Sequence, residues 1–128
     1  MSRLLRHYPM DDASGELTDV ASGQHGSPEN VEYQGGQFLG QGVMRFDPGT
    51  PLNRVPIPSL KSLNAYTVSL WANPAEDPSG YAFYCGDNNA FVMGVNADGT
   101  WRFGNFNHGE ISAPQTSGWT HACGTWDG

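Results

Sequence analysis

Turn-forming residues interrupt this sequence at short intervals, and they constrain its fold more than any other feature. The 128 residues include 17 glycines and 9 prolines, which favour turns and leave little material for long helices. Helical periodicity is hard to find, and its one short candidate, residues 59–63, would make a single turn. Short β-branched and aromatic runs between the turn signals indicate strands. The nine predicted strands are residues 4–8, 31–33, 42–46, 53–57, 66–72, 81–85, 90–95, 101–104 and 119–126.

A hairpin of residues 90–95 and 100–103 is the clearest local unit. Its connection contains Asp98 and Gly99, which tolerate the positive φ that a tight turn requires. Nine short strands at close spacing predict an all-β fold, an antiparallel β-sandwich or jelly roll in a single domain of residues 1–128. Residues 15–41, rich in Gly, Ser and Gln, are predicted to form a long loop that packs on the sandwich.

Charge and composition exclude several classes of partner. The chain carries 6 Lys and Arg against 13 Asp and Glu, a formal net charge of -7. This balance argues against a nucleic acid or an anionic membrane surface, because phosphate attraction needs clustered cations. The 38% of hydrophobic residues is enough for a packed core. Residues 1–10 lack the apolar segment of a secretory signal peptide, and no window approaches the ~18 apolar residues of a membrane span.

Six segments, taken in order, resemble one known family. Together they are similar to the laminin-G-like and pentraxin-like jelly rolls of the concanavalin A-like lectin/glucanase superfamily. The segments are residues 7–11 (HYPMD), the loop Asp19-x-x-Ser22-Gly23-x-x-Gly26, residues 40–47 (GQGVMRFD), 55–58 (VPIP), 66–71 (YTVSLW) and 119–128 (WTHACGTWDG).

The resemblance also predicts how the sheet edges are completed. In the family, the strand that ends in Asp-Gly leads into a hairpin and then into strands that close the sandwich. We therefore expect the sandwich of residues 1–128 to be incomplete at its C-terminus. Unpaired strand edges invite further pairing, so we expect self-association or another subunit that supplies strands.

Two groups of oxygen ligands are candidates for calcium. Asp87 and Asn88 fall where pentraxins place an Asp-Asn pair that binds this ion, which prefers hard oxygen ligands. Asp11 and Asp19 form a weaker candidate, because related jelly rolls often hold a structural cation near the first strand. Ordinary turn formation by short polar side chains is the alternative for both groups, and it is the one that their sequence context favours.

The two cysteines, Cys85 and Cys123, permit a single disulfide. Cys123 resembles one half of the pentraxin disulfide, but Ser69 occupies the position of the other half. A Cys85–Cys123 bond would have to join different strands, and two buried free thiols are the alternative.

Enzyme signatures are missing from the sequence. Concanavalin A-like glucanases carry carboxylates on alternate positions of one strand, and no E-x-D-x-E pattern occurs. His121 and Cys123 share one face of a strand, but the family places both positions in a structural strand. We therefore predict no enzymatic activity.

Aromatic and amide side chains give the best indication of a ligand. Aromatic faces stack on pyranose C–H groups while amides and carboxylates bind hydroxyls. Trp101 could instead fill the core of the sandwich. Trp71 and Trp119 are predicted to be core residues, because they lie in strand motifs of the family. The candidate sugar-binding residues are Tyr81, Trp101, Asn105, Phe106, Asn107, His108 and Glu110.

The function that these observations favour is a non-catalytic binding or adhesion module. Its partner would be a carbohydrate or a protein surface outside the cell, with calcium as a possible cofactor. One alternative is a structural virion protein, such as a phage fibre or capsid decoration, which needs no signal peptide. The other alternative is a fragment of a concanavalin A-like glycoside hydrolase.

Overall fold

The computed structural model describes residues 3–38, 41–47, 52–59, 63–74, 82–87, 91–96, 98–105, 109–114 and 117–127. Within these residues there are eight strands, all pairings between them are antiparallel, and no helix occurs. No helix of the described part is therefore long and apolar enough to cross a membrane. The chain forms two compact units, Met1–Pro58 and Ser59–Gly128.

The first unit contains one short hairpin. β1 (Glu32–Phe38) pairs with β2 (Gln41–Arg45), and the register shifts between Gln34 and Phe38. The predicted strands at residues 42–46 and 31–33 are confirmed as β2 and as the start of β1. The prediction of a long loop over residues 15–41 is wrong from residue 32 on, because residues 32–38 form β1. Two glycines in the middle of β1 interrupt the alternation of side chains that would have revealed it.

The other strands predicted in the first unit do not form ladders. Residues 4–8 have no strand pairing, and residues 53–57 contribute one bridge, between Arg54 and Glu29. Residues 60–62 lie outside the described part, so the predicted helical turn at 59–63 stays a prediction.

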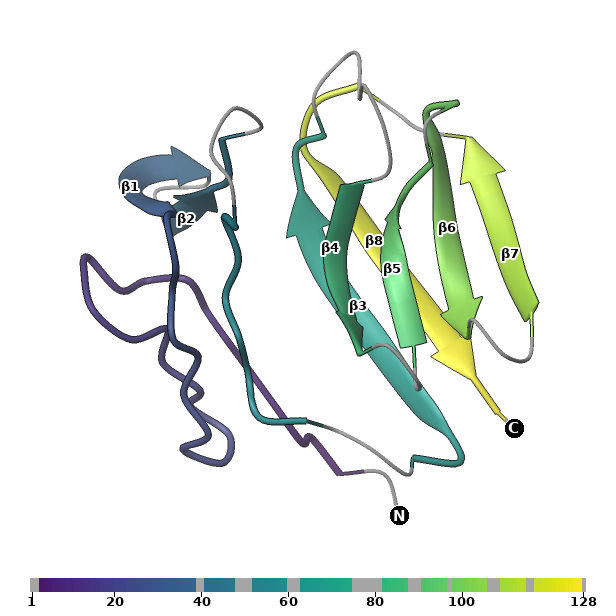
Figure 1. Ribbon diagram of the computed structural model, residues 1–128, viewed down its shortest axis with the longest axis horizontal. Coiled ribbons are helices and arrows are strands. Elements are labelled where there is room, and N and C mark those ends of the chain that lie inside the picture. Colours follow the sequence, from purple (N-terminus) through teal and green to yellow (C-terminus); the bar gives the residue numbers. More distant parts are fainter. Residues whose placement is uncertain are drawn as a thin grey trace. The chain divides into compact units, whose positions relative to one another are not determined.

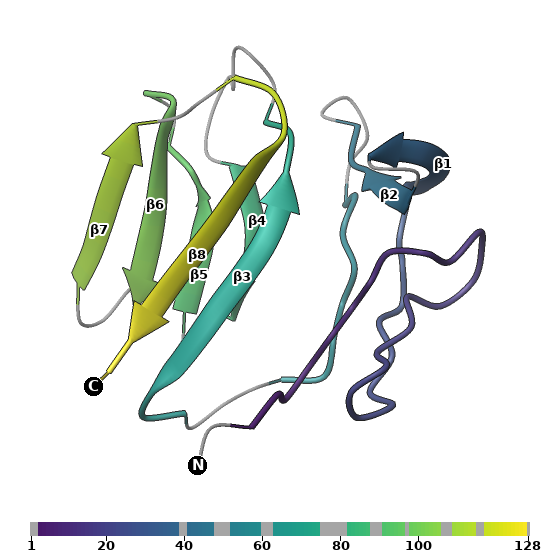
Figure 2. The same cartoon turned by 180° about the vertical axis from the view of Figure 1, so that it is seen from behind.

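The second unit consists of two layers of strands. One is a four-stranded sheet in the order β4 (Ala82–Asp87), β5 (Phe91–Val95), β6 (Thr100–Asn105) and β7 (Gly109–Pro114). The other is the pair β3 (Tyr66–Ala72) and β8 (Thr120–Trp126). Figures 1 and 2 show this pair crossing one face of the four-stranded sheet, with β7 at the side away from β3. The predicted all-β antiparallel class is confirmed.

The predicted hairpin is confirmed as β5 and β6. Gly99 has a φ of 79°, and its N–H donates to the carbonyl of Asn96 at 2.9 Å. Asp98 accepts hydrogen bonds from the N–H of Thr100 at 3.0 Å and from its hydroxyl at 2.7 Å. These bonds lower the pKa of the Asp98 carboxyl, the side-chain bond having the larger effect. The turn therefore closes with local chemistry that the sequence already contains.

β7 is a strand that the sequence did not predict. Its residues, GEISAP, include one large apolar side chain, Ile111, and all six residues are exposed. A strand at the edge of a sheet needs no apolar alternation, because its partner β6 supplies the ladder. The pattern that identifies buried strands is therefore absent here.

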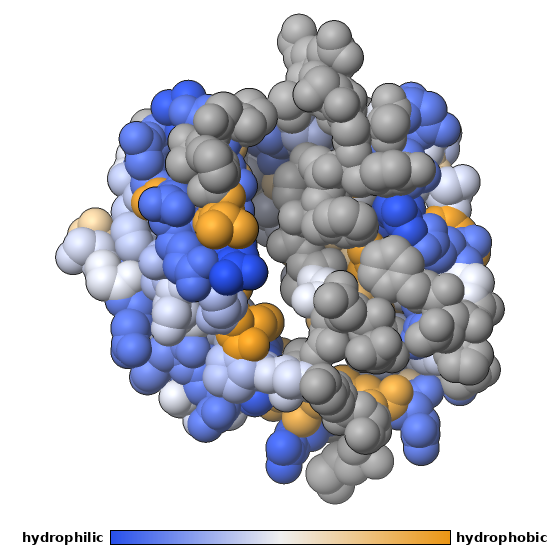
Figure 3. All heavy atoms as spheres, viewed as in Figure 1, coloured by the Kyte–Doolittle hydropathy of each residue, from blue (hydrophilic) through white to orange (hydrophobic). Residues whose placement is uncertain are grey.

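The core lies between the two layers. Met93 faces Phe103 and Val95 faces Trp101 across the β5–β6 ladder, and all four side chains are buried. Alternate residues of β3 and β8 pack against them from the other layer, namely Tyr66, Val68, Leu70, Ala72, Ala122 and Trp126. On the face drawn in Figure 3, the described residues are mostly hydrophilic, with separate hydrophobic patches among them.

The layers approach each other closely at Phe103 and Gly124. Gly124 is buried in β8, and a Cβ atom at this position would overlap ring carbons of Phe103. The ring of Tyr66 packs edge-on against Phe103, with 6.3 Å between the centroids. Glycine is therefore required at position 124 for steric reasons, because the Phe103 ring occupies the space of a side chain.

We predict that Gly124→Ala destabilises the second unit by about 1–3 kcal/mol, the usual cost of overpacking a core. Urea unfolding followed by tryptophan fluorescence measures this, since all four tryptophans lie in Ser59–Gly128. Ser112→Ala is the control, because it changes a small exposed side chain of β7 in the same unit. An unchanged urea midpoint for Gly124→Ala would contradict the packing.

Candidate functional site

An exposed face of β3 and β8 carries a group of polar and aromatic side chains. The burial of both strands alternates, so one set of residues enters the core and the other points outward. The outward residues face each other in pairs: Thr67 with Thr125, Ser69 with Cys123, and Trp71 with His121. We call these six residues the outer face.

The side chains of the outer face contact one another across the ladder. The hydroxyl oxygens of Thr67 and Thr125 are 3.0 Å apart, and a hydrogen bond of 2.7 Å joins Ser69 Oγ to His121 Nε2. The rings of Trp71 and His121 have centroids 5.0 Å apart and planes inclined by 35°. Trp71 is 53% exposed, so a broad aromatic surface lies beside three hydroxyl groups.

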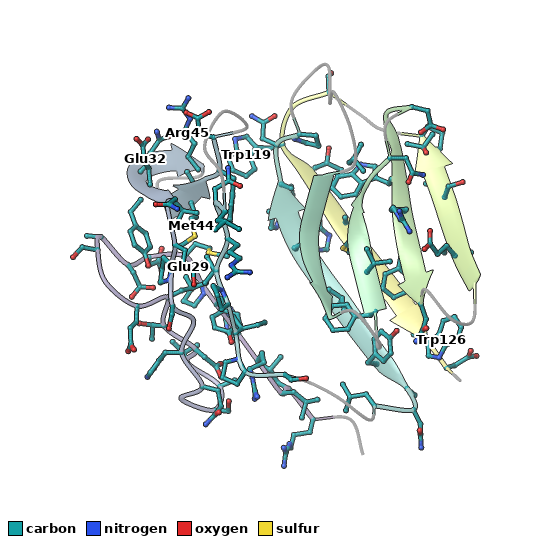
Figure 4. The ribbon with its side chains drawn as sticks, in the orientation of Figure 1. Glu29, Glu32, Met44, Arg45, Trp119 and Trp126 are labelled. Carbon is teal, nitrogen blue, oxygen red and sulfur yellow. The ribbon has the colours of Figure 1, made fainter. Side chains whose placement is uncertain are left out.

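The sequence placed Trp71 and Trp119 in the core, and the structure corrects this. Trp119 is 36% exposed and directly precedes β8 (Figure 4). The signal was available in the alternation of β3, where Tyr66, Val68 and Leu70 turn inward. Because side chains alternate along a strand, Trp71 must then lie on the opposite face.

Cys123 is a free, exposed cysteine on the outer face. It was expected to be buried or joined to Cys85, whose side chain lies outside the described part. Ser69 stands directly opposite Cys123 in the ladder, so the alignment inferred from the resemblance to pentraxins agrees with the register.

We predict that Ser69→Cys creates a disulfide with Cys123. Facing residues in an antiparallel ladder have Cα atoms roughly 4.5–5.5 Å apart, which a disulfide spans. Thiol labelling under denaturing, non-reducing conditions should find two reactive thiols in the parent chain and one in Ser69→Cys. Thr67→Cys, which faces Thr125, is the matched control and should give three; three for Ser69→Cys would mean that the register is different.

Asp19, one of the calcium candidates, lies at the centre of a hydrogen-bonded loop. One carboxylate oxygen accepts the N–H groups of His7 at 2.9 Å and Ala21 at 3.0 Å. The other accepts the Ser22 hydroxyl and the N–H of Gln24, the latter at 3.2 Å. A carboxylate offers about four lone-pair sites. These donors use all of them, so Asp19 does not fit the role of a cation ligand.

The environment of Asp19 favours its charged form. Desolvation by itself would raise the pKa of this buried carboxyl, but the hydrogen bonds from Ser22, His7, Ala21 and Gln24 together hold the pKa far below its ordinary value. Arg6 adds an ion pair at 4.0 Å. The carboxylate therefore ties the N-terminal segment to the loop that follows it.

We predict that Asp19→Asn lowers the stability of this loop and makes that stability less dependent on pH. A carboxyl whose folded pKa is lowered stabilises the fold above its unfolded pKa of about 3.9, and this stabilisation is lost as the pH falls through the folded value. Hydrogen exchange of residues 17–26, corrected for intrinsic rates, should lose protection in Asp19→Asn at pH 6. Its protection should change less than that of the parent chain between pH 6 and pH 3.

Glu16→Gln is the control for that experiment, because it removes one exposed carboxylate without touching the Asp19 bonds. Equal protection in the parent chain and in Asp19→Asn would contradict the structural role of Asp19.

The other calcium candidates are Asp11, Asp87 and Asn88. Asp11 is exposed, while the side chain of Asp87 and all of Asn88 lie outside the described part. Among the described residues no group of three or more His, Cys, Asp or Glu side chains is arranged to hold a metal ion. Calcium binding at Asp87 and Asn88 therefore stays a prediction.

The predicted sugar-binding residues are distributed differently from the expectation. Trp101 and Asn105 are each 8% exposed, and Trp101 belongs to the core cluster, so its ring face cannot stack on a sugar. Glu110 bonds to Arg102 on the neighbouring strand. The other four, Tyr81, Phe106, Asn107 and His108, lie outside the described part.

Two antiparallel sheets packed face to face define a β-sandwich, and the family comparison agrees. The Laminin_G_3 family, described as the concanavalin A-like lectin/glucanases superfamily, matches residues 48–128. The chain therefore belongs to this superfamily, which implies a jelly-roll sandwich and includes both lectins and glucanases. The match begins after residues 7–47, so the resemblance of those segments stays a prediction. Neither the curated proteins nor the solved structures contain a match.

Proposed function

We propose that the chain is a non-catalytic carbohydrate-binding module that acts outside the cell and binds neutral sugars through the outer face of β3 and β8. The observation that carries the proposal is the exposed ring of Trp71, which lies 5.0 Å from the His121 ring and beside a row of hydroxyl groups. Membership of a superfamily of lectins and glucanases supports a saccharide ligand.

The chemistry of the outer face suits a neutral sugar. An indole ring offers an apolar surface to the C–H groups of a pyranose. Thr67, Ser69 and Thr125 place hydroxyl groups nearby, and these donate to and accept from sugar hydroxyls. The six residues include no carboxylate and no Lys or Arg, which suits a neutral ligand better than an acidic or basic one.

The same composition supports binding in preference to hydrolysis at this face. Glycoside hydrolysis needs a pair of carboxyl groups on either side of the scissile bond. A module that lacks them on its aromatic surface can hold a glycan without cleaving it.

We predict that Trp71→Ala lowers the affinity for a neutral oligosaccharide at least tenfold, because it removes the stacking surface. A glycan array selects the oligosaccharide, and isothermal titration then compares the variants. Ile111→Ala removes an apolar side chain that is even more exposed than Trp71 from β7, so it is the control and should bind like the parent chain.

Two results would contradict the proposal. Equal affinity of Trp71→Ala and the parent chain would remove the outer face from sugar binding. Turnover of polysaccharides by the parent chain would favour the hydrolase alternative.

A further inference from the structure

His121 is the one side chain of the outer face that can become a cation. Among its six residues only His121 and Cys123 titrate, and a thiol can only lose a proton. His121 is exposed and contacts two residues of β3. Its Nε2 atom lies 2.7 Å from Ser69 Oγ, and its ring centroid lies 5.0 Å from that of Trp71. The outer face therefore carries a positive charge only when His121 is protonated.

The charge state of His121 also sets the direction of its hydrogen bond to Ser69. A neutral imidazole has one donor and one acceptor nitrogen, so the Ser69 hydroxyl can donate to Nε2 and keep its lone pairs for a ligand. In the protonated ring both nitrogens are donors. Nε2–H must then donate to Ser69 Oγ, and the hydroxyl hydrogen of Ser69 turns away from the ring. Protonation therefore makes the Ser69 hydroxyl a donor toward a ligand.

The neighbours of His121 on the two strands carry no charge that would cancel this one. His121 faces Trp71 and Ser69 on β3, and the next outward residue of β8 is Cys123. Neither strand contains Asp, Glu, Lys or Arg. Asp127 follows β8 and lies about 20 Å away along an extended strand, which is beyond the range of screened charges. β6 packs on β8 from the inner side, and Figure 2 shows no other strand of the second unit in front of β3 and β8.

We propose that protonation of His121 lets the outer face bind acidic sugars, namely uronates, in addition to neutral ones. The inference rests on the proposed sugar-binding function of this face. A uronate carboxylate only accepts hydrogen bonds, and protonation supplies both the charge of the imidazolium and the free donor of Ser69. Hydrogen bonds with an ionised partner are roughly twice as strong as neutral ones. The Trp71 ring stacks on the sugar in both cases.

Uronates and their methyl esters separate the effect of charge from that of sugar shape. A glycan array carries oligomers of glucuronate, galacturonate, mannuronate and guluronate, each beside its methyl ester. It is read at about pH 7.5 and about pH 5.5, between which histidine changes charge while a carboxylate stays ionised. At least one uronate should bind about fivefold or more tightly at the lower pH. Its methyl ester should bind similarly at both pH values.

Variants locate the effect at His121. His121→Gln keeps a hydrogen-bonding side chain beside Ser69 but carries no charge, so titration calorimetry should find that uronate binding no longer depends on pH. His7→Gln is the matched control, because it removes an exposed imidazole from the first unit and should retain the pH dependence. Cys123→Ser removes the other titratable group of the outer face and should also retain it. The urea midpoint of each variant at both pH values verifies that it is folded.

Proton uptake distinguishes a role of the charge from a structural role of the ring. Calorimetry of the parent chain in buffers of different ionisation enthalpy should show that uronate binding takes up protons near pH 7, because the ligand favours the protonated ring. His121→Gln should show no uptake.

Three outcomes would overturn the inference: uronate affinity that does not rise on acidification, the same rise in His121→Gln, and uronate binding without proton uptake. In each case, binding of the methyl esters that Trp71→Ala weakens would leave the proposed sugar-binding function intact. No binding of any glycan at either pH would refute the proposed function and this inference together.

Discussion

The two layers of the second unit can pack closely because Gly124 leaves the space of a side chain to the Phe103 ring. A ring can approach a backbone this closely only where no side chain intervenes. The close approach brings β8 onto the four-stranded sheet, so that Ala122 and Trp126 join the core. Because β8 is fixed in this way, its alternate residues must point outward. The outer face is therefore a consequence of the packing on the inner side.

The first unit is organised by a polar centre instead. Its described part has few buried apolar side chains, of which Leu17 is 3% exposed. The carboxylate of Asp19 accepts hydrogen bonds from residue 7 and from residues 21–24. A buried carboxylate is tolerated only when hydrogen bonds replace its hydration. The two units thus use different physical means to order a chain that is rich in turns.

The sequence predicted those parts of the fold that depend on local information. β3 and β8 alternate clearly between inward and outward residues, and the β5–β6 turn contains its own Asp98 and Gly99 chemistry. β1 was predicted only at its start, residues 31–33, because its glycines remove the alternation further on, and β7 was missed because its exposed polar residues show none. Among the proposed sugar-binding residues, Trp101 shows what local sequence cannot distinguish. An aromatic residue next to a polar turn has the same local sequence pattern whether its ring is buried in the core or exposed.

By itself, the sequence determined the all-β class, the hairpin and the superfamily, because turn chemistry and side-chain alternation act over a few residues. Only the tertiary structure decided which faces are covered. Trp71 is exposed and Trp101 is buried because one lies outside the two layers and the other between them. Ile111 is exposed although it points inward, since neither β3 nor β8 lies over it. Whether a side chain is buried depends on strands that are far apart in the chain, so a local sequence pattern does not show which side chains the opposite layer covers.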